Sequence, residues 1–117
     1  MNSPKKNISD IPSELNHKDT THRKRLIRVD EHHKGDIATM NYAWLEPGKQ
    51  LDTHLHSDGE EFYYFLEGFG TILVGDAWIP VTPGDFVTIP VGAHHSIKNT
   101  AQKNLVFLTI RTVASPS

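Results

Sequence analysis

The alternation of hydrophobic and polar positions predicts a series of short β-strands separated by turns. Residues 37–45 alternate well enough to form a strand with two distinct faces. Aromatic and β-branched residues, which favour strands, dominate the later segments 61–66, 71–74, 86–89 and 105–113. Turn signals such as Asp58-Gly59 and Pro83-Gly84 separate these segments at intervals of roughly eight to twelve residues. This rhythm predicts an all-β sandwich or barrel.

The chain divides into a polar lead, one β domain and a short tail. Its 117 residues are enough for a single domain. Residues 1–21 carry few large apolar side chains and are expected to be flexible, with at most a weak helical turn or an arm around Ile8, Ile11 and Leu15. We expect the β domain over residues 22–114 and a flexible C-terminus over residues 115–117.

The composition narrows the range of partners. The formal net charge is -2, which gives no strong electrostatic attraction to nucleic acid or to an acidic membrane. No apolar stretch approaches the length that spans a bilayer, and no apolar signal region is visible near the start, so a cytoplasmic location is the default expectation. The absence of cysteine excludes disulfides and thiolate chemistry. The expected partner is a small molecule.

Three histidines and a glutamate are spaced in a way that suits one metal ion. His54 and His56 are two residues apart, and such side chains point to the same face of a strand. Glu61 follows a predicted tight turn, so a hairpin would bring it beside the histidine pair. His95 lies on a later strand and can complete the set only if the sheet closes on itself. Imidazole with one carboxylate suits Fe, Mn, Ni, Cu or Zn and does not favour Ca or Mg.

The same residues stand in two motifs through which the chain resembles the small single-domain cupins. The first motif, G-x5-H-x-H-x4-E-x6-G, is complete in Gly48, His54, His56, Glu61 and Gly68. The second motif, G-x5-P-x-G-x2-H-x3-N, is complete in Gly84, Pro90, Gly92, His95 and Asn99. The resemblance implies a cupin β-barrel (a double-stranded β-helix, or jelly roll). It also implies one divalent transition metal on His54, His56, Glu61 and His95.

Two of these ligand positions have a neighbouring alternative. Glu60 could replace Glu61, and His94 could replace His95, although the motif spacing favours Glu61 and His95. His94 would then point to the opposite face of its strand. The other histidines lie in polar surroundings and are interpreted as solvated: His17, His22, His32 and His33.

Strand parity predicts what surrounds the metal. If Glu61 points inward, Tyr63 and Phe65 do so as well, and the expected lining is aromatic and aliphatic with a few polar groups. On the last strand the inward set is either Phe107, Thr109 and Arg111, or Val106, Leu108 and Ile110. No cluster of lysine and arginine is recognised that could clamp a phosphate, although Arg111 or Lys49 could contribute one charge. Tyr63 is the candidate catalytic residue, for a substrate hydrogen bond or proton transfer, with core packing as the alternative.

Three functions fit this pattern. The favoured one is a metal-dependent enzyme for a small organic or carbohydrate-derived substrate, acting as a dioxygenase or as an isomerase or lyase. The second is a non-catalytic module that binds a small sugar or carboxylate. The third is an assembly unit with a structural metal, which is disfavoured because structural sites are usually closed by protein ligands. The resemblance to small cupins also implies a homodimer.

Overall fold

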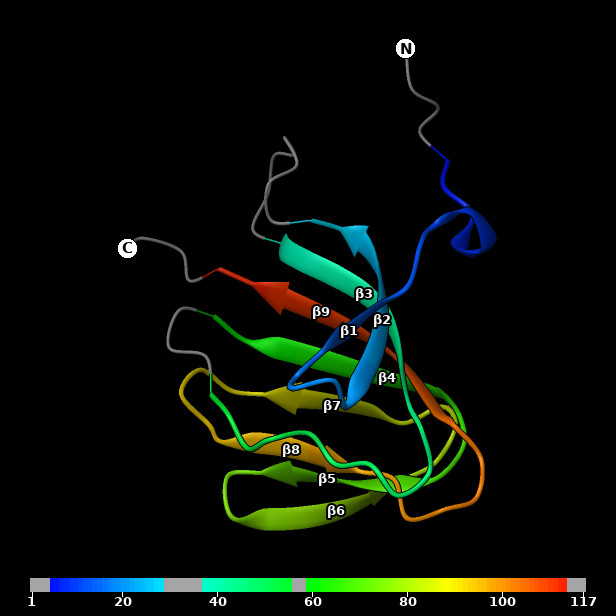
Figure 1. The fold of residues 1–117 in the computed structure, drawn as a ribbon. Helices are drawn as coiled ribbons and strands as arrows, with labels where there is room; N and C mark the ends of the chain where they lie inside the picture. The colour runs from blue at the N-terminus through cyan, green and yellow to red at the C-terminus, as the bar shows by residue number, and fades with distance from the viewer. Residues whose placement is uncertain (1–4, 29–36, 56–58, 114–117) are drawn as a thin grey trace.

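The structure, a computed structural model, describes residues 5–28, 37–55 and 59–113 and is built almost wholly from strands (Figure 1). The prediction of an all-β protein is confirmed. The strands are β1 (Glu14–Asn16), β2 (Thr21–Ile27), β3 (Ile37–Leu45), β4 (Glu61–Glu67), β5 (Gly70–Val74), β6 (Ala77–Val81), β7 (Phe86–Ile89), β8 (His95–Lys98) and β9 (Leu105–Thr112). In the described part of the chain, no helix is long and apolar enough to cross a membrane.

The strands form two sheets that enclose one apolar core. A six-stranded sheet has the order β1-β2-β3-β9-β4-β7, and a three-stranded sheet has the order β6-β5-β8. The core takes side chains from both sheets, because alternate residues of each strand turn their apolar side inward. Its buried members are Ala43, Leu45, Leu51, Tyr63, Phe65, Ile72, Val81, Ile89, Ile97, Leu105 and Phe107.

Register decides which residues of the large sheet face inward. On β4, Glu61, Tyr63 and Phe65 are buried, as strand parity predicts. On the neighbouring strand β9, these three residues lie opposite Arg111, Thr109 and Phe107. The inward set on the last strand is therefore the one that contains Arg111.

The lead segment, expected to be flexible, contributes to the sheet. Residues 8–10 form a short 3-10 helix, and β1 pairs with β2 in antiparallel register, with Glu14 opposite Arg23 and Asn16 opposite Thr21. Lys24 and Lys6 donate hydrogen bonds from their ammonium groups to the carbonyls of Ile8 and Leu26, respectively. Residues 14–16 thus extend the inner face of the large sheet by one strand.

Candidate functional site

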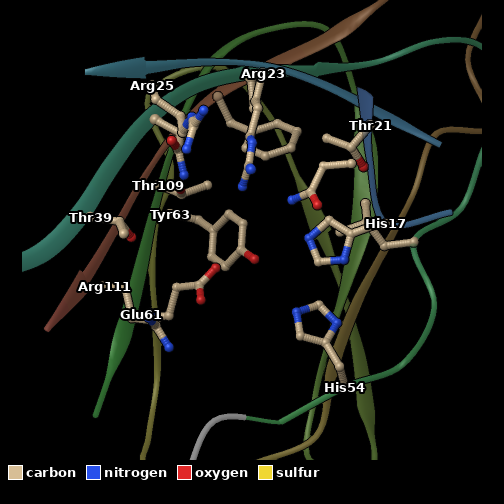
Figure 2. Close-up of a pocket in the computed structure, with 15 residues that line it drawn as sticks. His17, Thr21, Arg23, Arg25, Thr39, His54, Glu61, Tyr63, Thr109 and Arg111 are labelled. Carbon is tan, nitrogen blue, oxygen red and sulfur yellow. Dashed lines mark hydrogen bonds between the residues drawn. The ribbon is translucent and has the colours of Figure 1, made fainter. Parts of the chain in front are cut away.

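A cavity of about 340 Å³ opens between the inner face of the large sheet and the segment that carries His54 (Figure 2). This volume is in the range of small-molecule sites. The lining comes from the β1–β2 hairpin, from β3, β4 and β9, and from Leu51 and His54. Its polar and charged members are Asn16, His17, Thr21, Arg23, Arg25, Thr39, Asn41, His54, Glu61, Tyr63, Thr109 and Arg111.

Backbone pairing places His54 beside His95. The segment 49–54 runs antiparallel along the free edge of β8, with hydrogen bonds from Leu51 N to Ile97 O (2.9 Å) and in both directions between His54 and His95 (3.0 and 2.8 Å). Ser96 adds a side-chain bond to Leu51 O. The imidazole rings of His54 and His95 consequently lie 4.0 Å apart between centroids.

Glu61 joins the two histidines from the large sheet. Its Oε2 lies 3.9 Å from Nε2 of His95, and both side chains are almost fully buried. The alternatives Glu60 and His94 are exposed, whereas Glu61 and His95 are buried. The structure therefore brings His54, Glu61 and His95 together, whereas His56 lies outside the described residues.

The donor set fits a transition metal. Nδ1 of His54 lies 2.8 Å from Asp52 O, and Nδ1 of His95 lies 3.3 Å from Ala93 O. A carbonyl can only accept a hydrogen bond, so Nδ1 carries the proton and Nε2 is the coordinating nitrogen, as in most metal-bound histidines. Among the described residues no group of three such side chains already forms a metal-binding cluster, and His56 lies outside these residues.

Tyr63 lies on the same face of β4 as Glu61, and its side chain is 1% exposed. Burial raises the pKa of the Tyr63 phenol well above its usual value, and the negative charge of Glu61 and a hydrogen bond to Glu61 raise it further. The phenol therefore keeps its proton at neutral pH. In Figure 2 its hydroxyl points into the cavity beside the Glu61 carboxylate.

The predicted apolar lining, without a basic cluster, is wrong. Arg23, Arg25 and Arg111 all line the cavity, together with threonine and asparagine side chains. The arginines come from strands β2 and β9, which are separated in the large sheet only by β3. Sequence reasoning named Arg111 as one possible charge but missed Arg23 and Arg25, because their place near β9 depends on this strand order. The resulting cavity is suited to an anionic ligand.

His17 is a further residue whose position sequence reasoning missed. Expected to be solvated, it lines the cavity, and its ring centroid lies 4.6 Å from that of His54. His17, Lys18 and Asp19 all have positive φ, which is costly for residues other than glycine. Lys18 also pairs with Asp52 at 3.1 Å, which ties the hairpin turn to the segment of His54. No local sequence signal predicts this contact.

With this geometry in place, comparison with known proteins identifies the family. The model of the Cupin domain family matches residues 42–111, which are more than half of the chain. The chain belongs to the cupin family, and its fold is the cupin jelly roll.

Individual relatives and solved structures are similar to this chain to different extents. The oxalate-binding protein of Thermotoga maritima is 35% identical over 66 residues, which are 56% of this chain and 54% of the relative. The chain therefore spans about half the length of the curated relatives it matches. The crystal structure of a predicted oxalate decarboxylase from Thermotoga maritima superposes with a TM-score of 0.83 at 26% identity, covering 92% of this chain and 96% of that chain. A sugar phosphate isomerase from Silicibacter pomeroyi shares the fold at 21% identity, with a TM-score of 0.76 and coverage of 93% and 75%.

Proposed function

We propose that this cupin is a metal-dependent enzyme that acts on a small carboxylate-bearing compound by proton-transfer chemistry of the isomerase or lyase type. One observation carries the proposal: His54 and Glu61 line a cavity whose walls also hold three arginines, and the buried His95 lies against both of them. This arrangement supplies metal ligands and anion-binding groups at the same cavity.

One divalent transition metal would be held by His54, His56, Glu61 and His95, of which His56 is assigned from the sequence spacing. When bound, such an ion stabilises negative charge that develops on a substrate oxygen. The two carbonyl groups of Asp52 and Ala93 keep the imidazoles in the tautomer that can coordinate. A carboxylate ligand favours retention of a divalent ion because it adds one opposite charge.

The chain's own residues supply the rest of the chemistry. The arginines orient the substrate carboxylate through paired N–H donors, and the surrounding core limits the access of water. Tyr63 holds its proton at neutral pH and is therefore the hydrogen-bond donor or general acid toward a substrate oxygen. Its phenolic oxygen is the atom at which we place the proton transfer.

The test is a screen of metal-reconstituted protein with keto acids, hydroxy acids and dicarboxylates, followed by mass spectrometry and an oxygen electrode. We expect consumption of at least one acid without oxygen uptake, with reversible loss of turnover on chelation. Tyr63→Phe should lower kcat by about 100-fold or more with little change in KM. Stoichiometric oxygen uptake would reject proton-transfer chemistry in favour of a dioxygenase.

Adjacent residues offer matched controls for the ligands. Glu61→Gln should depress turnover more than it depresses substrate affinity, whereas Glu60→Gln removes the same charge at an exposed position outside the cavity and should change neither. Equal effects of the two substitutions would contradict the assignment of Glu61.

A binding module is the second candidate, favoured by the name of the Thermotoga maritima relative, an oxalate-binding protein. The same arginines and metal ligands could retain a carboxylate without converting it. Recovery of a tightly bound acid unchanged after long incubation with metal-loaded protein and air, with no acid of the screen consumed, would replace the enzyme by this alternative.

A further inference from the structure

The strongest feature that the proposed function leaves unexplained is a carboxylate held between two arginines that line the cavity. Glu14 on β1 accepts a bond of 2.7 Å from Nε of Arg23, and the same Oε1 lies 2.7 Å from Nε of Arg25. The second oxygen of Glu14 lies 3.3 Å from Nη2 of Arg25. Two guanidinium groups thus face one carboxylate, and together they offer it more N–H donors than either group alone.

This arginine pair belongs to the cavity. Arg23 and Arg25 alternate with outward-facing residues on β2, so both project from the inner face of the large sheet, and both line the space shared with His54 and Glu61. Figure 2 shows them at the end of the cavity away from His54 and Glu61, with Tyr63 between the two ends. A ligand of two acidic groups could therefore reach the metal ligands with one group and the arginines with the other.

The net positive charge of the cavity favours a ligand with two acidic groups. The three arginines of the cavity outweigh the carboxylates of Glu14 and Glu61 by one positive charge, and a divalent ion on the proposed ligands would raise the excess to three. A dicarboxylate would offset most of that excess, whereas a monocarboxylate would leave most of it uncompensated.

Glu14 is placed where a ligand carboxylate could displace its side chain from the two arginines. It lies on a strand of three residues at the edge of the sheet, and its side chain is 38% exposed. The three side chains are part-buried, so solvent still screens their ion pairs in part, and short edge strands open easily. A substrate carboxylate offers the two arginines the same acceptor atoms without removing them from the cavity wall.

We propose that Arg23 and Arg25 form a subsite for the distal carboxylate of a substrate with two acidic groups, and that Glu14 occupies this subsite until the substrate displaces it. The inference rests on the proposed function for the other end of the substrate. It makes the β1–β2 hairpin, whose first strand comes from the lead segment, responsible for selecting the substrate class.

Calorimetric titration of the full-length, metal-loaded protein tests this with malonate, succinate and glutarate against butyrate, a chain of similar length with one carboxylate. We expect at least one dicarboxylate to bind at least tenfold more tightly than butyrate. Glu14→Gln, which removes the competing charge and keeps the side-chain shape, should tighten dicarboxylate binding about fivefold. Glu67→Gln removes the same charge at an exposed position outside the cavity and should have no effect.

Variants of the arginine pair test the subsite independently. Arg25→Gln should reduce dicarboxylate affinity to near that of butyrate and leave butyrate affinity unchanged, while Lys24→Gln makes the same charge change on the opposite face of β2. Arg25→Lys, which keeps the charge, should lose part of the preference because it lacks the planar fork. Circular dichroism confirms that each variant is folded.

The inference is overturned if Glu14→Gln weakens dicarboxylate binding, since Glu14 would then only hold β1 in place. It is also overturned if inorganic phosphate binds more tightly than every dicarboxylate, or if Arg25→Gln and Lys24→Gln behave alike. A chelator-treated sample distinguishes failure of the proposed subsite from failure of the proposed function. A dicarboxylate preference that persists with its Glu14 and Arg25 effects in metal-free protein supports the subsite independently of the metal, whereas the proposed function fails if metal-loaded protein consumes no acid of the screen.

Discussion

Gly59 should be the position where adding one methyl group does the most damage to both the fold and the site. A Cβ at Gly59 would stand 1.8 Å from the carbonyl oxygen of Thr112 and 2.7 Å from its carbonyl carbon. Real contacts of this kind are no closer than about 3 Å, so one of the two backbones must move by about 1.2 Å. The clashing atoms belong to the backbone, which cannot relieve the clash by a change of rotamer as a side chain can.

That movement would break the local pairing at the end of β9. Thr112 N donates to Glu60 O at 3.0 Å, and Glu60 N donates to Thr112 Oγ1 at 3.2 Å. Loss of two hydrogen bonds, at about 1 kcal/mol each, together with overpacking of about 1 kcal/mol or more, predicts that Gly59→Ala lowers the free energy of unfolding by about 3 kcal/mol. Glu61 follows two residues later, so metal affinity should fall as well.

Gly75→Ala is the matched control. Gly75 has a φ of +66° with no atom within 4 Å of an added Cβ, so alanine there meets only the left-handed backbone cost of about 1 kcal/mol. Urea unfolding of both variants gives the free energies, and titration with a divalent metal gives the affinities. Equal destabilisation by Gly59→Ala and Gly75→Ala, or unchanged metal affinity in Gly59→Ala, would refute this reasoning.

Further predictions concern the buried polar groups and the outer face of the large sheet. Because the pKa of Tyr63 is raised on folding, its contribution to stability is complete below about pH 10 and is lost as the pH rises through the folded value. Metal-free wild-type protein should therefore lose unfolding free energy above about pH 10 more steeply than Tyr63→Phe, by up to about 1.4 kcal/mol per pH unit in urea titrations. Asn99 is 1% exposed and donates to two backbone carbonyls at 2.8 Å, so Asn99→Ala should cost about 3 kcal/mol in the same assay, while Ala at the exposed Asn104 should cost less than about 0.5 kcal/mol. The homodimer remains a prediction, supported by exposed aromatic side chains at Tyr64 and Phe86; light scattering at micromolar concentration should give a dimer mass that Phe86→Glu reduces, and a monomer mass for wild type would reject it.

The sequence predicted the features that depend on local patterns. Alternation over residues 37–45 matches the bounds of β3, and parity on β4 correctly placed Tyr63 and Phe65 inside with Glu61. Motif spacing favoured Glu61 over Glu60 and His95 over His94, and in each pair the structure buries the favoured residue and exposes its neighbour. These predictions succeeded because successive side chains point to opposite faces of a strand, whatever the position of that strand in the fold.

The features that were missed depend on contacts distant in sequence. β1 is three residues long and shows no alternation of its own, since pairing with β2 determines its conformation. Arg23 and Arg25 do share one strand face, but their meeting with Arg111 requires the order β2-β3-β9. His17 reaches the cavity through three successive residues of positive φ, a conformation that its sequence does not favour.

Metal content tests the central claim most directly. Protein purified without chelator, or reconstituted with Fe, Mn, Ni, Cu or Zn and desalted, should hold close to one divalent ion per chain by elemental analysis. His95→Ala, checked for folding by circular dichroism, should lose most of this ion, whereas His94→Ala, at the exposed neighbouring position, should retain it. Wild-type protein that stays metal-free after reconstitution, or folded His95→Ala that keeps a full equivalent of metal, would contradict the account.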